Sequence, residues 1–275
     1  DKHFYYSPDC GIILWEEQSS ECNVTDIEII TKLNKQIISG KDAKGNPLSE
    51  TTRWINLSVE GHEEIENNPY MHGIGKTKSE YVVAVFNEDY TTVTIRKNGN
   101  NSDGLMKDFS TTPPYDTTLS QHRNTIKEII IEEGVVSIGK NAFTGFDEAT
   151  KLVLPNGLKI IDLCAFNGCD NITNVNLPET MEYFGDYAFY TCRGITNINI
   201  SVSVNHIGNA AFGDLRNCPA IIVDENNPYY NSVDGVVYNE NFTTLVQYPA
   251  GKSNANYTLL DTTKLIMAYG FAGNF

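Results

Sequence analysis

ITNVNLPETMEYFGDYAFYTCRG, residues 172–194, is the stretch that decides the fold, because much of the chain repeats it. Its Ala-Phe pair recurs every 23 residues, at 142–143, 165–166, 188–189 and 211–212. Other apolar columns keep the same phase, and the clearest is Ile129, Leu152, Val175, Ile198 and Ile221. Self-similarity at about 20–29 residues is typical of leucine-rich solenoids. The pattern therefore predicts a stack of 23-residue coils.

Each coil is expected to begin with a short strand. In residues 172–178, Val175 and Leu177 alternate with Asn176, so the asparagine faces outward while the two apolar side chains face the interior. Pro178 follows directly, where its missing N–H ends a ladder at little cost. One coil cannot bury its own apolar set, but parallel stacking at about 4.8 Å aligns the phenylalanines into one core. We therefore expect a leucine-rich repeat solenoid, β-rich with short turns or 3-10 segments.

The repeat also resembles a known family. The pattern I-x-x-I-x-I/L-P-x-x-L-x-x-I-G-x-x-A-F-x-x-C is similar to the BspA-type leucine-rich repeats of bacterial and protozoan surface proteins, over about residues 80–275. This resemblance implies a secreted or surface-exposed protein used for adhesion or binding, and it brings no catalytic residues. Residues 226–251 resemble the insertion that such proteins often carry between repeats.

Three regions are predicted along the chain. Residues 1–79 share nothing with the repeat and are expected to form a small α+β region, with a buried strand near residues 12–15 and a helix from about residue 25 to 39. Residues 80–125 resemble a capping segment, with a hairpin formed by 81–86 and 91–96. Residues 126–275 carry the repeats, interrupted at 224–256 by a projecting hairpin. The aromatic residues of that hairpin either bind a ligand or pack it onto neighbouring coils.

Composition narrows the classes of partner. The chain has 275 residues and a formal net charge of −15 at pH 7, which argues against nucleic acid and anionic membranes as partners. Acidity that keeps an exported protein soluble is the plain interpretation, and calcium binding is the alternative. No run of 18 apolar residues occurs, so no transmembrane segment is expected. We expect an extracellular or cell-surface protein whose signal peptide has been removed.

The six cysteines suggest different roles. Cys10 and Cys22 flank a polar stretch and form the candidate disulfide of an oxidising compartment. Cys169 and Cys192 share a column in which the first repeat has Phe146, so we expect buried free thiols, with a disulfide between coils as the alternative. No C-x-x-C spacing occurs, and no zinc site is expected.

Catalytic motifs are not found in the sequence. Residues 73–77 resemble the end of a P-loop, but Tyr70 stands where its first glycine is required. The one local concentration of acid–base groups is His62, Glu63, Glu64 and His72, which a solvated loop explains equally well. We expect a non-enzymatic protein without a cofactor. An enzyme or accessory domain with its chemistry in residues 1–79 is the alternative.

The candidate ligand-binding surface is the outward face of the strands. Its central column and its flanking positions are Ile130, Val153, Asn176 and Asn199, and Lys151, Asn174 and Asn197. Amide arrays can hydrogen-bond protein backbones or sugars, and a flat strand surface gives affinity through area. We therefore predict a non-catalytic binding or adhesion protein that recognises a host or matrix protein through this face. A glycan is the alternative ligand, and the oligomeric state is left open.

Overall fold

The computed structural model describes residues 71–99, 102–111, 116–253 and 256–274, together with two strands near the N-terminus. The chain divides into two compact units, Asp1–Asn68 with Asn98–Asn101, and Pro69–Lys97 with Ser102–Phe275. In the first unit, β1 (Lys2–Tyr6) and β2 (Ile13–Glu17) pair antiparallel. The helix expected at about 25–39 and the candidate disulfide of Cys10 and Cys22 lie outside the described residues.

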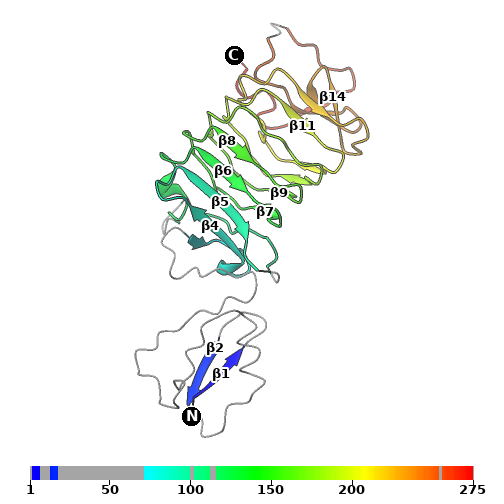
Figure 1. The fold of residues 1–275 in the computed structure, drawn as a ribbon. Coiled ribbons are helices and arrows are strands. Elements are labelled where there is room, and N and C mark those ends of the chain that lie inside the picture. The colour runs from blue at the N-terminus through cyan, green and yellow to red at the C-terminus, as the bar shows by residue number, and fades with distance from the viewer. Residues whose placement is uncertain are drawn as a thin grey trace. The chain divides into compact units, whose positions relative to one another are not determined.

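A hairpin opens the second unit. β4 (Val82–Phe86) pairs antiparallel with β5 (Thr92–Lys97), and a short 3-10 helix, η1 (Ser79–Tyr81), precedes β4. β5 then lies parallel to the first strand of the repeats, so the hairpin covers that end of the stack (Figure 1). β3 (Met71–Gly73) also pairs with β4, so this sheet starts before residue 80. The division into regions 1–79, 80–125 and 126–275 stays a prediction.

The repeats form two ladders on different sides of the coils, and within each ladder the strands of successive coils pair in parallel. The first ladder contains β6 (Glu128–Ile131) and β8 (Lys151–Val153), and it resumes with β11 (Ile198–Ile200) and β13 (Ile221–Val223). The second contains β7 (Ser137–Ile138), β9 (Ile160–Ile161), β10 (Tyr183–Phe184) and β12 (His206–Ile207). Figure 1 shows β5, β6 and β8 as successive rungs. A second short 3-10 segment, η2 (Ser120–His122), precedes the repeats. The predicted solenoid is confirmed.

The first ladder is interrupted at residues 174–176. No strand forms there, and among the described residues no backbone hydrogen bond joins 174–176 to a neighbouring coil. The segment is Asn174-Val175-Asn176, and asparagine disfavours strands because its side chain competes for backbone groups. Val175 is nevertheless buried at 3% exposure. The strand expected here is therefore wrong, whereas the inward and outward alternation of its side chains is correct.

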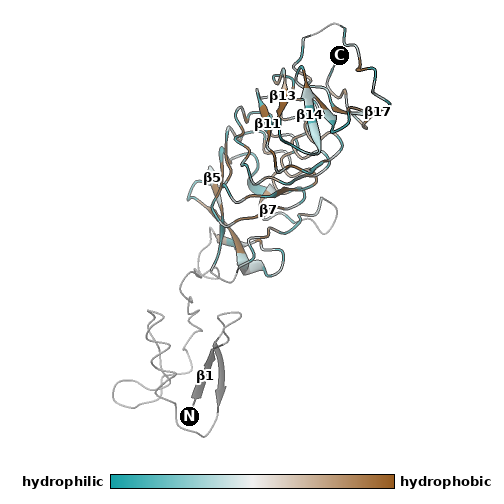
Figure 2. Cartoon of the chain, turned by 90° about the vertical axis from the view of Figure 1, so that its right-hand side faces the viewer, coloured by the Kyte–Doolittle hydropathy of each residue, from teal (hydrophilic) through white to brown (hydrophobic). Residues whose placement is uncertain are grey.

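The phenylalanine column forms one stack in the interior. Phe143, Phe166, Phe189 and Phe212 are all 0% exposed. Successive ring centroids lie 5.2, 5.2 and 6.1 Å apart, with the ring planes within 10° of parallel. These rings belong to one apolar core that continues into the β4–β5 hairpin. In Figure 2 the strands β11 and β13 are coloured as hydrophobic, in keeping with their inward isoleucines.

An inserted sheet follows β13. β14 (Tyr230–Val233), β15 (Val236–Asn239) and β16 (Thr244–Gln247) are antiparallel, and β17 (Leu265–Ile266) joins β16 in parallel. Tyr238 and Tyr248 are 0% and 3% exposed and build a second, smaller core. Tyr229, in contrast, is 48% exposed. Most aromatic residues of the insertion therefore pack it in place.

The cysteines of the repeats are free thiols. Cys169 and Cys192 are fully buried, and their Sγ atoms donate to the carbonyl oxygens of Phe143 and Phe166 at 3.2 and 2.9 Å. Burial raises the pKa of the Cys169 thiol well above its usual value. These two residues act as small apolar side chains, as the repeat column predicted.

Candidate functional site

We define the outward strand face as the column Ile130, Val153, Asn176, Asn199 and Ile222, together with the flanking residues Lys151, Asn174 and Asn197. Successive side chains of a strand point to opposite sides, and the exposures follow that rule. On β8, Leu152 is 8% exposed whereas its neighbour Val153 is 39% exposed. On β13, Ile221 is buried and Ile222 is 50% exposed. The face is therefore open to solvent at Val153 and at Ile222.

The strand register brings most of this column together. Ile130 pairs with Val153, and Asn199 pairs with Ile222. Asn176 belongs to the coil between these two pairs, is exposed, and has no ladder partner. Ile130 is half-buried. The sequence prediction omitted Ile222, although it lies 23 residues after Asn199 and the repeat phase alone would have found it.

The flanking residues are exposed and carry little free charge. Lys151 Nζ lies 2.9 Å from Glu128 Oε2 in an ion pair of the neighbouring coil. Exposed pairs of this kind stabilise a fold by only about 0–1 kcal/mol, but they neutralise the surface. Asn174 Nδ2 donates to the hydroxyl of Thr173 at 3.4 Å, and Asn197 lies one residue before β11. On this side of the face Lys151 is therefore paired, whereas Lys127 is exposed.

The other side of the face is acidic. Exposed carboxylates follow the strands in three coils, and we name them the acidic edge: Glu132, Glu133, Glu179, Asp224 and Glu225. Among the described residues these side chains form no ion pair. Sequence reasoning missed this edge, although each carboxylate comes within a few residues of a strand position in the repeat.

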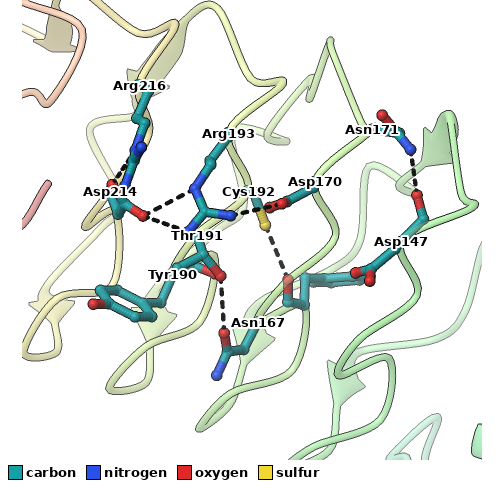
Figure 3. Close-up of polar contacts among 11 residues, drawn as sticks. Asp147, Asn167, Asp170, Asn171, Tyr190, Thr191, Cys192, Arg193, Asp214 and Arg216 are labelled. Atoms are coloured by element: carbon teal, nitrogen blue, oxygen red, sulfur yellow. Dashed lines mark hydrogen bonds and ion pairs between the residues drawn. The ribbon is translucent and has the colours of Figure 1, made fainter.

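A second polar cluster lies on the side of the coils that carries the turns around the Ala-Phe pairs, which we name the turn side (Figure 3). The Asp214 side chain is 6% exposed and lies 2.9 Å from Arg193 Nη2 and 2.8 Å from Arg216 Nε. Arg193 also reaches Asp170 in the preceding coil, at 2.8 Å from Nη1 to Oδ2. These contacts tie three coils together. Because the charges are paired within the chain, we interpret the cluster as structural.

Tyrosines on the turn side join the last coil to the stack. The rings of Tyr187 and Tyr269 lie 5.6 Å apart, edge to face, and Tyr190 packs against Tyr187 at 5.4 Å. A hydrogen bond with Tyr269 raises the pKa of Tyr187 from its usual 10 to about 12. Tyr269 itself is 57% exposed.

The described residues contain no cluster of metal-ligating side chains. No three His, Cys, Asp or Glu side chains there come together as metal ligands. His62, Glu63 and Glu64 lie outside the described part of the chain, and His72 packs edge-on against the ring of Phe86 at 5.7 Å. Within that part, no helix has the length and apolar composition needed to cross a membrane.

Comparison with solved structures identifies a relative of the same fold. The structure is similar to a leucine-rich repeat protein of Eubacterium ventriosum, with a TM-score of 0.56 and 23% identity over 74% of this chain and 57% of that one. It also matches the pneumococcal vaccine antigen PcpA, with a TM-score of 0.44 and 19% identity over 70% of this chain and 60% of that one. The chain thus spans less than two thirds of either protein. At 23% identity, the likeness to the Eubacterium ventriosum protein shows the fold alone.

No curated protein sequence matches this chain. Residues 119–232, in contrast, match six copies of the BspA type leucine rich repeat region. That match covers the strands of both ladders and the phenylalanine stack described above. These coils are therefore BspA-type leucine-rich repeats.

Proposed function

We propose that this chain is a non-catalytic binding or adhesion protein, secreted or displayed at the cell surface, and that it recognises a host or matrix protein through the outward strand face. The family to which its repeats belong suggests binding or adhesion. The observation that carries the proposal is the exposure of Val153 at 39% and Ile222 at 50% on the outward strand face. Burying these two side chains against a partner removes apolar surface from water, which favours binding.

The asparagines between these residues add hydrogen-bonding capacity. Asn176 and Asn199 are exposed, and the hydrogen bonds of the described residues do not include their side-chain amides. Each amide can donate and accept, so it can contact backbone groups of a partner without requiring a charge. The same amides could bind a glycan, and the experiment below separates the two ligands.

The test compares two double variants that add the same charge. Asn176→Arg with Asn199→Arg alters the outward strand face, whereas Asn205→Arg with Asn217→Arg alters exposed positions elsewhere on the coils. Binding of the full chain to immobilised matrix proteins and to a glycan array is measured by surface plasmon resonance and fluorescence. We expect the first double variant to weaken protein binding about tenfold or more, which corresponds to about 1.4 kcal/mol, with an unchanged melting temperature.

The control double variant should bind like the wild type. Equal binding by all three proteins would remove the outward strand face from consideration. Saturable binding to glycans but to no protein would replace the proposed protein ligand with a sugar. Failure to bind either class would favour a purely structural spacer.

A further inference from the structure

The outward strand face has a spacing that selects the conformation of its ligand. Val153 and Ile222 are separated by three coil steps. The coils between them stay paired through β9, β10 and β12, and through β11 and β13, where stacked strands lie about 4.8 Å apart, so the two side chains stand about 14 Å from each other. An extended chain advances about 3.4 Å per residue, and residues i and i+4 on one of its faces are therefore separated by nearly the same distance. An extended segment that crosses the coils can place one apolar side chain on each of these residues.

The middle of the face suits the backbone of such a segment. Asn176 and Asn199 lie between the two apolar positions, and both are exposed. Hydrogen bonds to main-chain groups give affinity for extended peptides, and pockets or apolar contacts for alternate side chains give specificity.

The acidic edge determines the charge that this ligand should carry. Its five carboxylates border the strands on one side, and the opposite border has threonines, the paired Lys151 and the exposed Lys127. The corresponding edge positions in the remaining coils are Pro155, Asn156, Ser201 and Val202, none of which is basic. The net charge of the whole chain is −15. Complementary potentials steer association and suppress partners of like charge.

We propose that the outward strand face binds an extended, basic segment of a partner protein that carries two apolar side chains four residues apart. The segment crosses the coils, its apolar side chains contact Val153 and Ile222, and its lysine or arginine side chains lie over the acidic edge. The apolar column selects the spacing of the ligand's apolar side chains, and the acidic edge selects the sign of its charge. Only the two together specify this ligand. The inference rests on the proposed function and specifies its ligand.

Synthetic peptides of equal length provide the test against the full chain. The first peptide has two valines four residues apart and lysines between and around them. A second peptide has the valines three residues apart, and a third replaces every lysine with glutamate. Fluorescence anisotropy measures their affinities at about 50 and about 300 mM NaCl, which brackets the range where screening becomes strong.

We expect the first peptide to bind about tenfold more tightly than either of the others, and to lose affinity at the higher salt concentration. Ile222→Asp should weaken its binding about tenfold or more, and so should Glu179→Lys combined with Glu225→Lys. Glu148→Lys, which is exposed and lies outside the acidic edge, serves as a charge control and should bind normally. These positions are exposed, so the variants should fold.

Equal affinity for the valine spacings of three and four, or for the lysine and glutamate peptides, would overturn the inference. That result leaves the proposed function intact if a matrix protein still binds and the Asn176→Arg/Asn199→Arg variant still weakens that binding. In another outcome, the Asn176→Arg/Asn199→Arg variant binds the matrix protein normally, but the peptide with valines four residues apart still binds most tightly. That outcome would support this ligand and would remove the matrix protein as its source.

Discussion

Phe166 provides the sharpest test of the stacked core. Its ring is 0% exposed and lies between Phe143 and Phe189, with both centroid distances at 5.2 Å. Replacing a buried phenylalanine with alanine costs about 3–5 kcal/mol, and each aromatic pair contributes about 0.5–1.5 kcal/mol beyond its buried area. Because Phe166 has two stacked partners, we expect Phe166→Ala to cost about 5 kcal/mol.

In a unit of this size, about 1 kcal/mol lowers the melting temperature by about 2–4 °C, so the expected decrease is about 10–20 °C. Differential scanning calorimetry of the full chain measures it. Phe166→Leu keeps most of the apolar volume but loses both stacked pairs, and it should cost about 1–3 kcal/mol. Tyr229→Ala removes an aromatic ring that is 48% exposed, and it should change stability by less than about 1 kcal/mol. If Phe166→Ala lowered stability as little as Tyr229→Ala, the stack would be refuted.

Three further predictions concern the ion pairs, the turn-side tyrosines and the ladder break. Asp214→Ala should destabilise the chain by about 3–5 kcal/mol in urea titrations, because it removes the nearly buried partner of two arginines, whereas Lys151→Ala should cost less than about 1 kcal/mol. The folded chain holds the Tyr187 proton up to about pH 12 and the unfolded chain up to about 10, so the stability contributed by this hydroxyl is complete below pH 10 and is lost between pH 10 and 12. The melting-temperature difference between wild type and Tyr269→Phe should therefore narrow over that range, and a constant difference would contradict the assignment. Hydrogen exchange followed by mass spectrometry should show fast exchange for the amide of Asn176, which slow exchange equal to that of β11 would contradict.

The stack itself is predictable because its information is local and repeated. The Ala-Phe step of 23 residues fixes which side chains face the interior, and parallel stacking is the arrangement that buries them all. Ile129, Leu152 and Ile198 therefore occupy the buried positions that the phase assigns to them. The same argument gives the outward positions, because side chains alternate along a strand.

The ladder break could not be predicted from one coil. Asn174-Val175-Asn176 and Asn197-Ile198-Asn199 have the same alternation, yet Ile198–Ile200 forms a strand and 174–176 does not. The difference lies in the neighbours, since β11 pairs with the β-branched strand Ile221–Val223. Pairing in a sheet depends on the adjacent coil, and the repeat pattern of a single coil does not contain that information.

Contacts on the turn side also could not be predicted from the sequence of one coil. Tyr187 and Ala210 have φ values of 58° and 52°, in a left-handed turn position where glycine would have been the usual signal in the sequence. Asp214 has a φ of 55° and stands in a column where earlier coils have Gly145 and Gly168. Its burial becomes acceptable only because arginines from two segments reach it, and such contacts follow from the three-dimensional stack.

The central claim is that the partner contacts the outward strand face. Oxidative footprinting of the full chain, free and bound to a matrix protein found in the binding panel, tests it most directly. We expect protection of Val153 and Ile222 in the complex, while Tyr187 and Tyr269 on the turn side react as in the free chain. Protection confined to the two tyrosines, with Val153 and Ile222 equally reactive in both states, would contradict it.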